Sequence, residues 1–368
     1  MSQAAAGRVN YAALLRLACL RVSRALVPAQ PAVRGMLDAV SSIRSRAWRQ
    51  GVEVAADFPL ADLDTWLGRD DVLVWLDILA PSPADLDVLR DELGMDQLAV
   101  EDAVEPMERP KATRHANHSF LTCYSTALEE GARSTRLVTG RVSAFLLKDG
   151  LITVRPDDTV DMDAILHRWQ EDGLLHSGVA ALVHGLLDHL VDGHFAAIGQ
   201  MDDELEDLED LLFESNRKPA ELQQRVFAMR KALVELRRVV LPMREVVTSV
   251  MRFRAESDRP LSSDLDGNFN DLYDHVIRAA EWTESLRDMV SSIFETQLSL
   301  QDARLNEVMK KLAGWGAIIA VPTAITGWFG QNLPYPGFSD TSGLIQSVVL
   351  ILVGSVGLFA VFRKFDWI

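Results

Sequence analysis

The stretch that decides the fold is NEVMKKLAGWGAIIAVPTAITGWFGQN, residues 306–332. No charged side chain occurs from Leu312 to Phe329, and these 18 residues would extend about 27 Å as a helix, close to the thickness of a bilayer's hydrocarbon core. A second uncharged run, residues 343–362, is richer in Val, Leu, Ile and Phe. The two runs predict a C-terminal transmembrane hairpin.

The first run is rich in small and polar residues, and with the residues upstream it keeps a spacing of alternating three and four. This spacing is a heptad seam, formed by Glu295, Ser299, Asp302, Asn306, Met309, Ala313, Gly316, Ala320, Thr323, Gly327 and Gly330. A ring of such helices would enclose a narrow, partly hydrated tube, which needs several copies of the chain. The seam leaves a second interpretation open, a hairpin that only anchors a soluble domain and uses small residues for packing.

Basic residues flank the two runs, with Lys310 and Lys311 before the first and Arg363 and Lys364 after the second. The connecting loop, residues 331–342, holds no Lys or Arg and a single acid, Asp340. The positive-inside rule therefore predicts a multi-pass protein of the cell (inner or plasma) membrane with both termini in the cytoplasm and the loop outside.

The chain of 368 residues carries a formal net charge of −16 and two cysteines. Strong negative charge argues against nucleic acid as a partner and favours cations, and so few cysteines fit a reducing compartment. Residues 1–50 differ, because they hold eight Arg and one Asp. We expect a basic N-terminal extension there, either a disordered segment (even one read from an upstream start codon) or an amphipathic helix on the membrane surface.

The pattern from residue 51 to 159 predicts a cytoplasmic α/β domain with a small mixed sheet. Buried strands are expected at 72–79 and 119–127, a Ser82-capped helix at 84–93, and a hairpin of two strands within 136–154. Helices follow over 160–267, then a stalk helix over 268–311, continuous with transmembrane helix 1 (312–330). A loop (331–342), transmembrane helix 2 (343–362) and a tail (363–368) complete a chain that is α+β in its first domain and mainly α overall.

Several segments together resemble the CorA metal-ion transporter family. Its hallmark is a Gly-Met-Asn tripeptide that follows an aromatic residue at the end of the first transmembrane helix, and this chain has Phe329-Gly330-Gln331-Asn332. NEVMK at 306–310, Pro322-Thr323 and the short loop fit too, as do ALVELRRVVLPMREVV (232–247) and NDLYDHVIRAAEWTESLRDMVSS (270–292). The resemblance covers roughly residues 55–368. It implies a homopentameric funnel in the lipid bilayer that conducts divalent cations and is gated by intracellular metal.

The resemblance assigns pore residues position by position. Gly330, Gln331 and Asn332 correspond to the outer selectivity ring, and Thr323 and Asn306 correspond to polar rings within the pore. The inner hydrophobic gate corresponds to Met309 and Leu312, with Ala320 where the family has a bulkier gate residue.

The resemblance also implies cytoplasmic carboxylates that bind regulatory metal between subunits. The corresponding residues are Asp102 with Glu101 beside it, Asp271, Asp188 and Glu295. The residues alone place His184, Asp188 and Asp192 on one helix face, which suits either a hard cation or an ordinary exposed polar surface.

Departures from the family pattern leave the ion open. Gln331 replaces the Met of the tripeptide, and the loop lacks the family's acids. We expect transport of Mg²⁺, which is also the regulatory ion, and of Co²⁺ or Ni²⁺. The first alternative is a Zn²⁺ transporter of the ZntB type, and the second is a membrane-tethered, non-conducting metal sensor or scaffold. Phosphate-loop, HExxH, GxSxG and CxxC motifs are absent from the sequence, so an enzyme is not expected.

Overall fold

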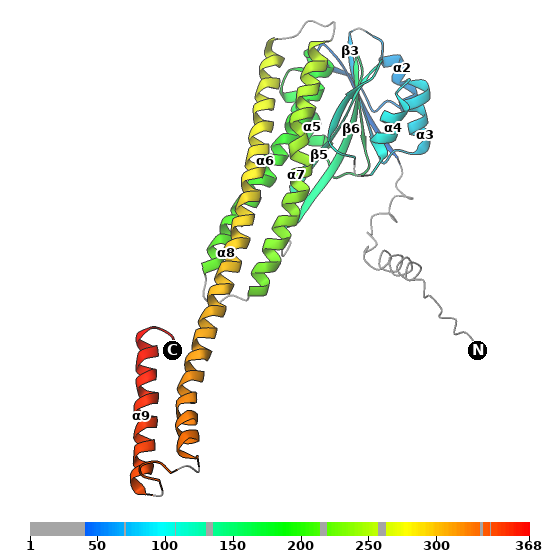
Figure 1. Ribbon diagram of the computed structural model, residues 1–368. Helices are drawn as coiled ribbons and strands as arrows, with labels where there is room; N and C mark the ends of the chain where they lie inside the picture. Colours follow the sequence, from blue (N-terminus) through cyan, green and yellow to red (C-terminus); the bar gives the residue numbers. More distant parts are fainter. Residues whose placement is uncertain are drawn as a thin grey trace, which may run out of the picture. The chain divides into compact units, whose positions relative to one another are not determined.

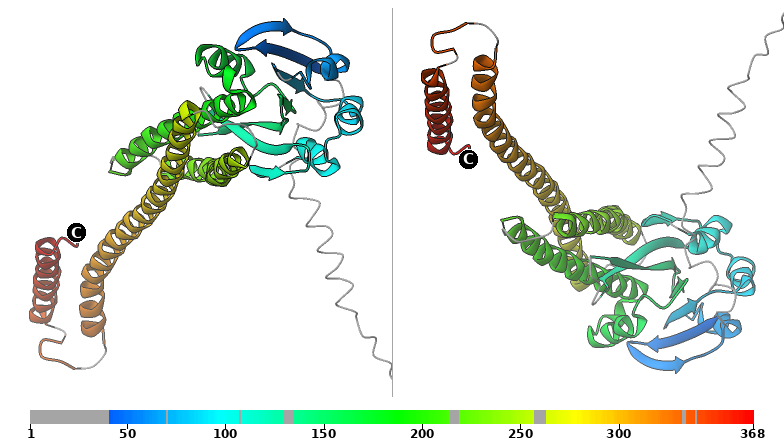
Figure 2. Two further views of the ribbon diagram at one scale, coloured as in Figure 1. Left: turned by 90° about the horizontal axis from the view of Figure 1, so that it is seen from above. Right: turned by 90° about the horizontal axis from the view of Figure 1, so that it is seen from below.

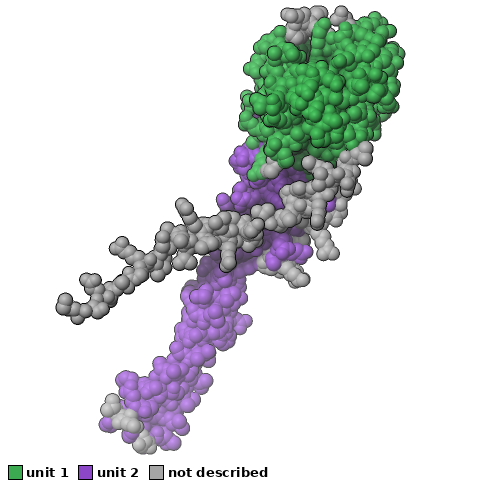
Figure 3. All heavy atoms as spheres, turned by 90° about the vertical axis from the view of Figure 1, so that its right-hand side faces the viewer, with its two compact units in different colours: residues 1–127, 138–195, 238–279 green, residues 128–137, 196–237, 280–368 purple. Residues whose placement is uncertain are grey.

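The computed structural model describes residues 41–69, 71–106, 108–129, 135–213, 219–256, 263–331, 334–338 and 340–368. The chain forms two compact units (Figure 3). Unit 1 comprises residues 1–127, 138–195 and 238–279, and unit 2 comprises residues 128–137, 196–237 and 280–368.

Unit 1 is built on a mixed sheet in which the described strands take the order β2-β1-β3-β7-β6-β5-β4. Strands β3 and β7 are parallel, whereas β1 pairs antiparallel with both β2 and β3, β4 with β5 and β6 with β7. The strands are β1 (Ser42–Arg49), β2 (Val52–Ala56), β3 (Val72–Leu79), β4 (Lys111–Arg114), β5 (Ser119–Leu128), β6 (Leu137–Leu146) and β7 (Gly150–Arg155). The predicted mixed sheet is confirmed.

Helices cover both faces of this sheet (Figure 1). On one face lie α2 (Leu63–Trp66), α3 (Pro83–Asp87), the π-helical turn η3 (Val88–Glu92) and α4 (Gln97–Val104). On the other face lie α5 (Met162–Glu171) and parts of α6 (Val179–Phe213), α7 (Pro219–Ala255) and α8 (Ser263–Phe329). Because both faces are covered, alternate residues of β3 enter different cores, Val74 and Leu76 in one and Leu73 and Trp75 in the other. This explains why β3 is almost continuously apolar.

A buried ion pair joins β3 to β7. Asp77 accepts from Arg155 Nη2 at 2.7 Å and from the Thr153 hydroxyl at 2.7 Å, and both charged side chains are almost fully buried. Arg155 also donates to Asp158 and to the Val160 carbonyl. These bonds satisfy the one carboxylate within the apolar strand, as a buried charge requires.

The predicted extension over residues 1–50 is wrong in its last part, because β1 begins at Ser42. Ala47 and Trp48 of β1 are buried and the strand pairs along its whole length with β3. The strand was not predicted because it contains three arginines. Each arginine forms an ion pair with a carboxylate outside the strand, as Arg46 does with Asp57 at 2.6 Å. The remainder of the extension, residues 1–40, lies outside the described residues.

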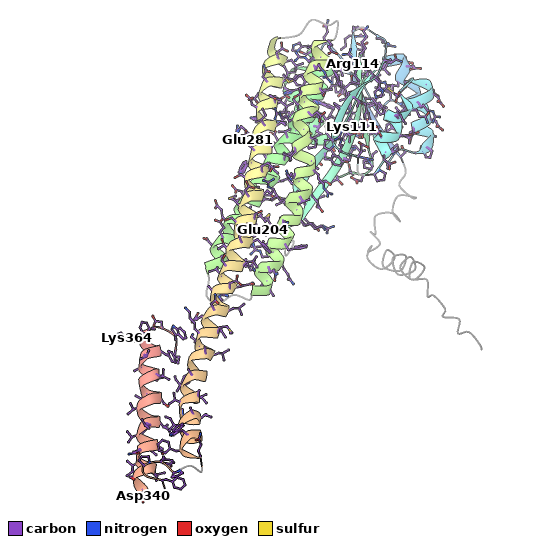
Figure 4. All side chains as sticks on the ribbon, viewed as in Figure 1. Lys111, Arg114, Glu204, Glu281, Asp340 and Lys364 are labelled. Carbon is purple, nitrogen blue, oxygen red and sulfur yellow. The ribbon has the colours of Figure 1, made fainter. Side chains whose placement is uncertain are left out.

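Unit 2 contains α6 from Ala196, α7 up to Arg237, and α8 from Ala280. Its buried residues include apolar side chains from all three helices, among them Leu205, Leu208, Met229, Leu233, Leu236, Leu286 and Val290. Ion pairs at its surface join Arg237 to Glu284 and Arg225 to Glu204, and Figure 4 labels Glu204 among the stick side chains.

The predicted continuity of the last cytoplasmic helix with the first apolar run is confirmed, since α8 is a single helix. A turn follows it, and then α9 (Thr341–Lys364) runs back alongside the end of α8 (Figures 1 and 2). The described residues contain two helices long and apolar enough to cross a membrane, α8 and α9, and their apolar windows are almost entirely unburied in the single chain.

Candidate functional site

Close packing joins α8 to α9 along one side of α8. Gly354 of α9 faces Val321 of α8 so closely that a Cβ at Gly354 would lie 2.8 Å from the Val321 side chain. Nearer the start of the apolar run of α8, the ring of Trp315 lies 6.3 Å from the ring of Phe359 on α9. Small residues thus let the two helices approach, as is usual in membranes.

The predicted seam lies on another side of α8. Every seam position from Glu295 to Gly330 is exposed in the single chain. At about 3.6 residues per turn, Gly316, Ala320 and Thr323 lie roughly opposite Val321 and its neighbours that meet α9. The hairpin therefore leaves the small and polar face of α8 uncovered.

Thr323 presents its oxygen on this uncovered face. Its hydroxyl donates to the Ile319 carbonyl at 3.0 Å, so its proton is used within the helix and its lone pairs remain available to a ligand. Asn306, further down the same face, is exposed. Neutral oxygens of this kind suit a cation that keeps its water shell.

Apolar side chains lie on or beside the seam on the N-terminal side of Thr323. Met309 and Leu312 each have an exposed fraction of 64%, and Ala320 is exposed on the same face. In the single chain nothing covers these apolar groups, which are costly to leave in water.

At the end of α8, Gly330 N–H donates to the Thr326 carbonyl, and Gln331 is exposed. The predicted selectivity residue Asn332 lies outside the described residues. Beyond it, Tyr335 donates to the Phe329 carbonyl at 3.2 Å, and its ring packs edge-on against Phe329. An aromatic contact of this loop, rather than a cluster of acids, therefore meets the helix end.

The carboxylate of Asp102 on α4 is paired within the chain. Lys111 of β4 lies 2.5 Å from Asp102 and 3.1 Å from Glu108. Partial burial lowers the pKa of Lys111, but the two carboxylates outweigh it, and the net shift is upward. Glu101 is exposed and accepts from the Gln97 amide at 2.9 Å. The Lys111 partner was not predicted, because only the fold brings β4 beside α4.

The other predicted carboxylates have different surroundings. Asp188 and Asp192 both pair with Arg168, at 3.2 and 2.8 Å, and burial raises the pKa of Asp188. His184, predicted on the same face, is buried against the Phe269 ring. In the single chain, Arg168 therefore compensates both carboxylates of this face, and His184 does not lie beside them at the surface.

Asp271 is exposed and lies 3.8 Å from His275, and Glu295 is exposed as well. Among the described residues, no group of three or more His, Cys, Asp or Glu side chains is arranged to hold a metal ion. A metal bound at these positions needs ligands from a second chain or from water.

Comparison with known proteins gives the family. Residues 70–364 match the family described as CorA-like Mg²⁺ transporter protein. The chain belongs to this family.

Among CorA relatives, the cobalt/magnesium transport protein CorA of Thermotoga maritima is 30% identical over 282 residues, which cover 75% of this chain and 77% of that protein. The zinc transport protein ZntB of Pectobacterium carotovorum is 28% identical over 260 residues, covering 67% of this chain and 74% of that protein. Both kinds of transporter are thus similar to this chain at comparable levels.

The fold agrees with the CorA family as well. The solved CorA magnesium transporter from Methanocaldococcus jannaschii superposes with a TM-score of 0.70 and 21% sequence identity, covering 90% of this chain and 100% of that one. CorA proteins are membrane transporters of metal ions and not enzymes, and the two apolar helices of this chain fit that class.

Proposed function

We propose that this chain is the subunit of a divalent cation channel that carries Mg²⁺, and also Co²⁺ or Ni²⁺, across the cell membrane. One observation carries the proposal, the uncovered face of α8 that combines Thr323, small residues and exposed apolar groups on the side away from α9. The CorA names of its relatives support the ion class.

The uncovered face also supports self-association. One chain presents one seam, so a closed pathway requires several copies with their seams turned inward. We expect a homopentamer, as the resemblance implies, with the bilayer around α9 and both termini in the cytoplasm. The exposed Met309 and Leu312 would then be covered by their counterparts.

Within that assembly, the ion enters at the ring of Asn332, with Gly330 and Gln331 beside it. It passes the rings of Thr323 and Asn306 while keeping most of its water, because Mg²⁺ dehydrates reluctantly. Met309 and Leu312 form the hydrophobic constriction, which opens by widening or wetting. Ala320 offers too small a side chain to close the pathway itself.

Intracellular metal closes the pore in this proposal. Asp102 and Asp271, with Glu101, Asp188 and Glu295 as further carboxylates, bind Mg²⁺ between neighbouring subunits in the closed arrangement. Losing the metal favours the open arrangement, because a ligand shifts an equilibrium by its differential affinity for the two states.

A second candidate, Zn²⁺ transport, is favoured by Gln331 in the tripeptide, by the loop with Asp340 as its single acid, and by the ZntB relative. A third, a non-conducting metal sensor or scaffold, requires that the uncovered seam serve packing alone.

The deciding experiment is ion flux into liposomes that contain the purified protein, with Mg²⁺, Co²⁺, Ni²⁺ and Zn²⁺ in parallel and defined pH gradients. Voltage-driven Mg²⁺ or Co²⁺ flux is expected, and Asn332→Ala should abolish it without changing the oligomeric mass in detergent. Zinc-selective flux that follows the pH gradient would support the second candidate. A stable monomer without flux would support the third.

A further inference from the structure

After α9 the chain reverses through a defined turn. The Trp367 N–H donates to the Phe362 carbonyl at 2.9 Å and the Asp366 N–H to the Arg363 carbonyl at 3.5 Å. Asp366 has a φ of +53°, the left-handed conformation that such a helix end requires. The ring of Trp367 stacks on that of Phe362 at 5.5 Å, which is the apolar contact that accompanies a Schellman turn. The reversal is therefore held by backbone bonds and by a ring pair.

The turn directs Ile368 onto α8. Gly314 is buried, whereas its neighbours Ala313 and Trp315 are exposed. A Cβ at Gly314 would lie 3.0 Å from Cδ1 of Ile368, 3.1 Å from its Cγ1 and 3.6 Å from the Phe362 ring. The missing side chain at Gly314 thus makes a notch that Ile368 fills (Figure 1 shows the chain end between α8 and α9).

This contact lies behind the predicted constriction. Leu312 comes two residues before Gly314, and at about 3.6 residues per turn it projects from nearly the opposite side of α8. Ile368 therefore packs on the back of the helical turn whose front carries Leu312. A side chain in this position sets how far that turn can rotate or move away from the proposed pathway.

We propose that Ile368 is a positioning residue for the gate, a wedge between α9 and the notch at Gly314 that holds Leu312 in its closed orientation. The inference rests on the proposed channel function. Its physical basis is close packing, since interiors resist the loss of even single methyl groups. The wedge acts within one chain and needs no bound metal.

A cross-linking experiment tests the contact independently of transport. Gly314→Cys combined with Ile368→Cys should form a disulfide within one chain in membranes. Cγ1 of Ile368 lies 3.1 Å from a Cβ at Gly314, and a cysteine sulfur at position 368 would take a similar place. The matched control pairs Gly316→Cys with Ile368→Cys, since a Cβ at Gly316 has no neighbour within 4 Å. Both pairs are made in a Cys19→Ser background that keeps the buried Cys123. Equal cross-linking of the two pairs would overturn the wedge.

The functional test measures flux in liposomes at high and at low Mg²⁺ on the side of the soluble domain. Ile368→Ala should raise the flux that persists at high Mg²⁺ by about tenfold, the effect of losing a few partly buried carbons, while flux at low Mg²⁺ stays unchanged. Ile368→Val should restore closure. Phe365→Ala is the control, because Phe365 belongs to the same segment but is 67% exposed.

A double-mutant cycle completes the test. Gly314→Val alone should displace Ile368 and raise the flux at high Mg²⁺. The double variant Gly314→Val with Ile368→Ala should close more fully than either single variant, because the valine side chain fills the space that the isoleucine side chain leaves. Additive effects, or an Ile368→Ala protein that closes as fully as the wild type, would overturn the proposal. A wild-type protein without flux would instead refute the channel function. The cross-link would then still test the contact between Ile368 and Gly314.

Discussion

The ammonium group of Lys111 lies 2.5 Å from the carboxylate of Asp102 and 3.1 Å from that of Glu108. Asp102 is a proposed ligand of the regulatory metal, so in the metal-free chain a cation from the protein already occupies its place (Figure 4 labels Lys111). The upward shift of the Lys111 pKa means that neutral pH does not remove this competitor. In the proposed mechanism, metal and Lys111 therefore compete for Asp102.

We expect Lys111→Met to lower the cytoplasmic Mg²⁺ concentration needed for closure by up to about fivefold, since a partly exposed ion pair contributes about 0.2–1 kcal/mol. The measurement is flux against Mg²⁺ concentration. Arg114→Met on the same strand, which removes a pair with Glu256, should leave that concentration unchanged. An unaltered Mg²⁺ dependence in Lys111→Met would argue against Asp102 as a ligand.

Thr323→Val should reduce Mg²⁺ flux by about tenfold, because it removes an oxygen from the uncovered face and leaves a methyl group in the proposed pathway. Thr326→Val is the matched control, since the Thr326 hydroxyl also donates to helix carbonyls, of Pro322 and Thr323, but lies off the seam. Equal losses in both variants would point to helix distortion rather than to ion contact.

Gly354→Ala should weaken the hairpin, because its Cβ would lie 2.8 Å from Val321 and overpacking typically costs about 1–3 kcal/mol. Thermal stability of the detergent-solubilised protein measures this, and Val321→Ala should restore it. Gly357→Ala serves as control, since a Cβ there has no neighbour within 4 Å. Similar melting temperatures for the Gly354 and Gly357 variants would contradict the close approach.

Arg155→Met should destabilise unit 1 by about 3–5 kcal/mol, because it leaves Asp77 buried and unpaired. Trp75 reports on this unit, since its indole donates to Thr153 beside the pair, and its fluorescence can follow unfolding in denaturant. Arg136→Met removes an exposed pair with Glu129 and should change stability by no more than about 0.5 kcal/mol. An Arg155→Met protein as stable as the wild type would show that the pair is dispensable.

Acid should destabilise unit 1 through His194. Burial lowers the pKa of His194 from 6.5 to about 4, and its Nε2–H donates to the Tyr124 carbonyl at 2.9 Å. The unfolded state therefore binds a proton that the folded state does not between these values, so stability is full above pH 6.5 and falls as pH drops toward 4, by about 3 kcal/mol at most. His194→Gln should flatten this dependence in denaturant unfolding at several pH values; an unchanged slope would assign it to other groups.

Periodicity allowed the long elements to be predicted from sequence. The seam spacing predicted the continuity of α8 and the exposure of its small face, and Ser82 predicted the start of α3. The structure adds Asp85, which completes a capping box with Ser82. Each of these depends on residues within a few positions of one another, where local physics decides.

The remaining features could not be predicted because they depend on pairs of residues that the fold brings together. β1 looked like part of a basic extension because its arginines find partners only in the folded unit. The pairing of Asp188 and Asp192 with Arg168 could not be predicted, because Arg168 lies on α5 and is distant in sequence. Lys111 beside Asp102 and Ile368 beside Gly314 likewise required the fold, since neither pair has a spacing that a sequence pattern can detect.

The loop between α8 and α9 has one more consequence. Tyr335 packs on Phe329 and Phe338, and Asp340 is the loop's single acid. In the proposed channel this loop forms the outer entrance, which would attract cations weakly, because long-range steering depends on clustered charge. The rate at which ions enter would then depend on their outside concentration rather than on electrostatic attraction. The flux through such a transporter would rise almost in proportion to the outside ion concentration, and its regulation would depend entirely on the cytoplasmic side.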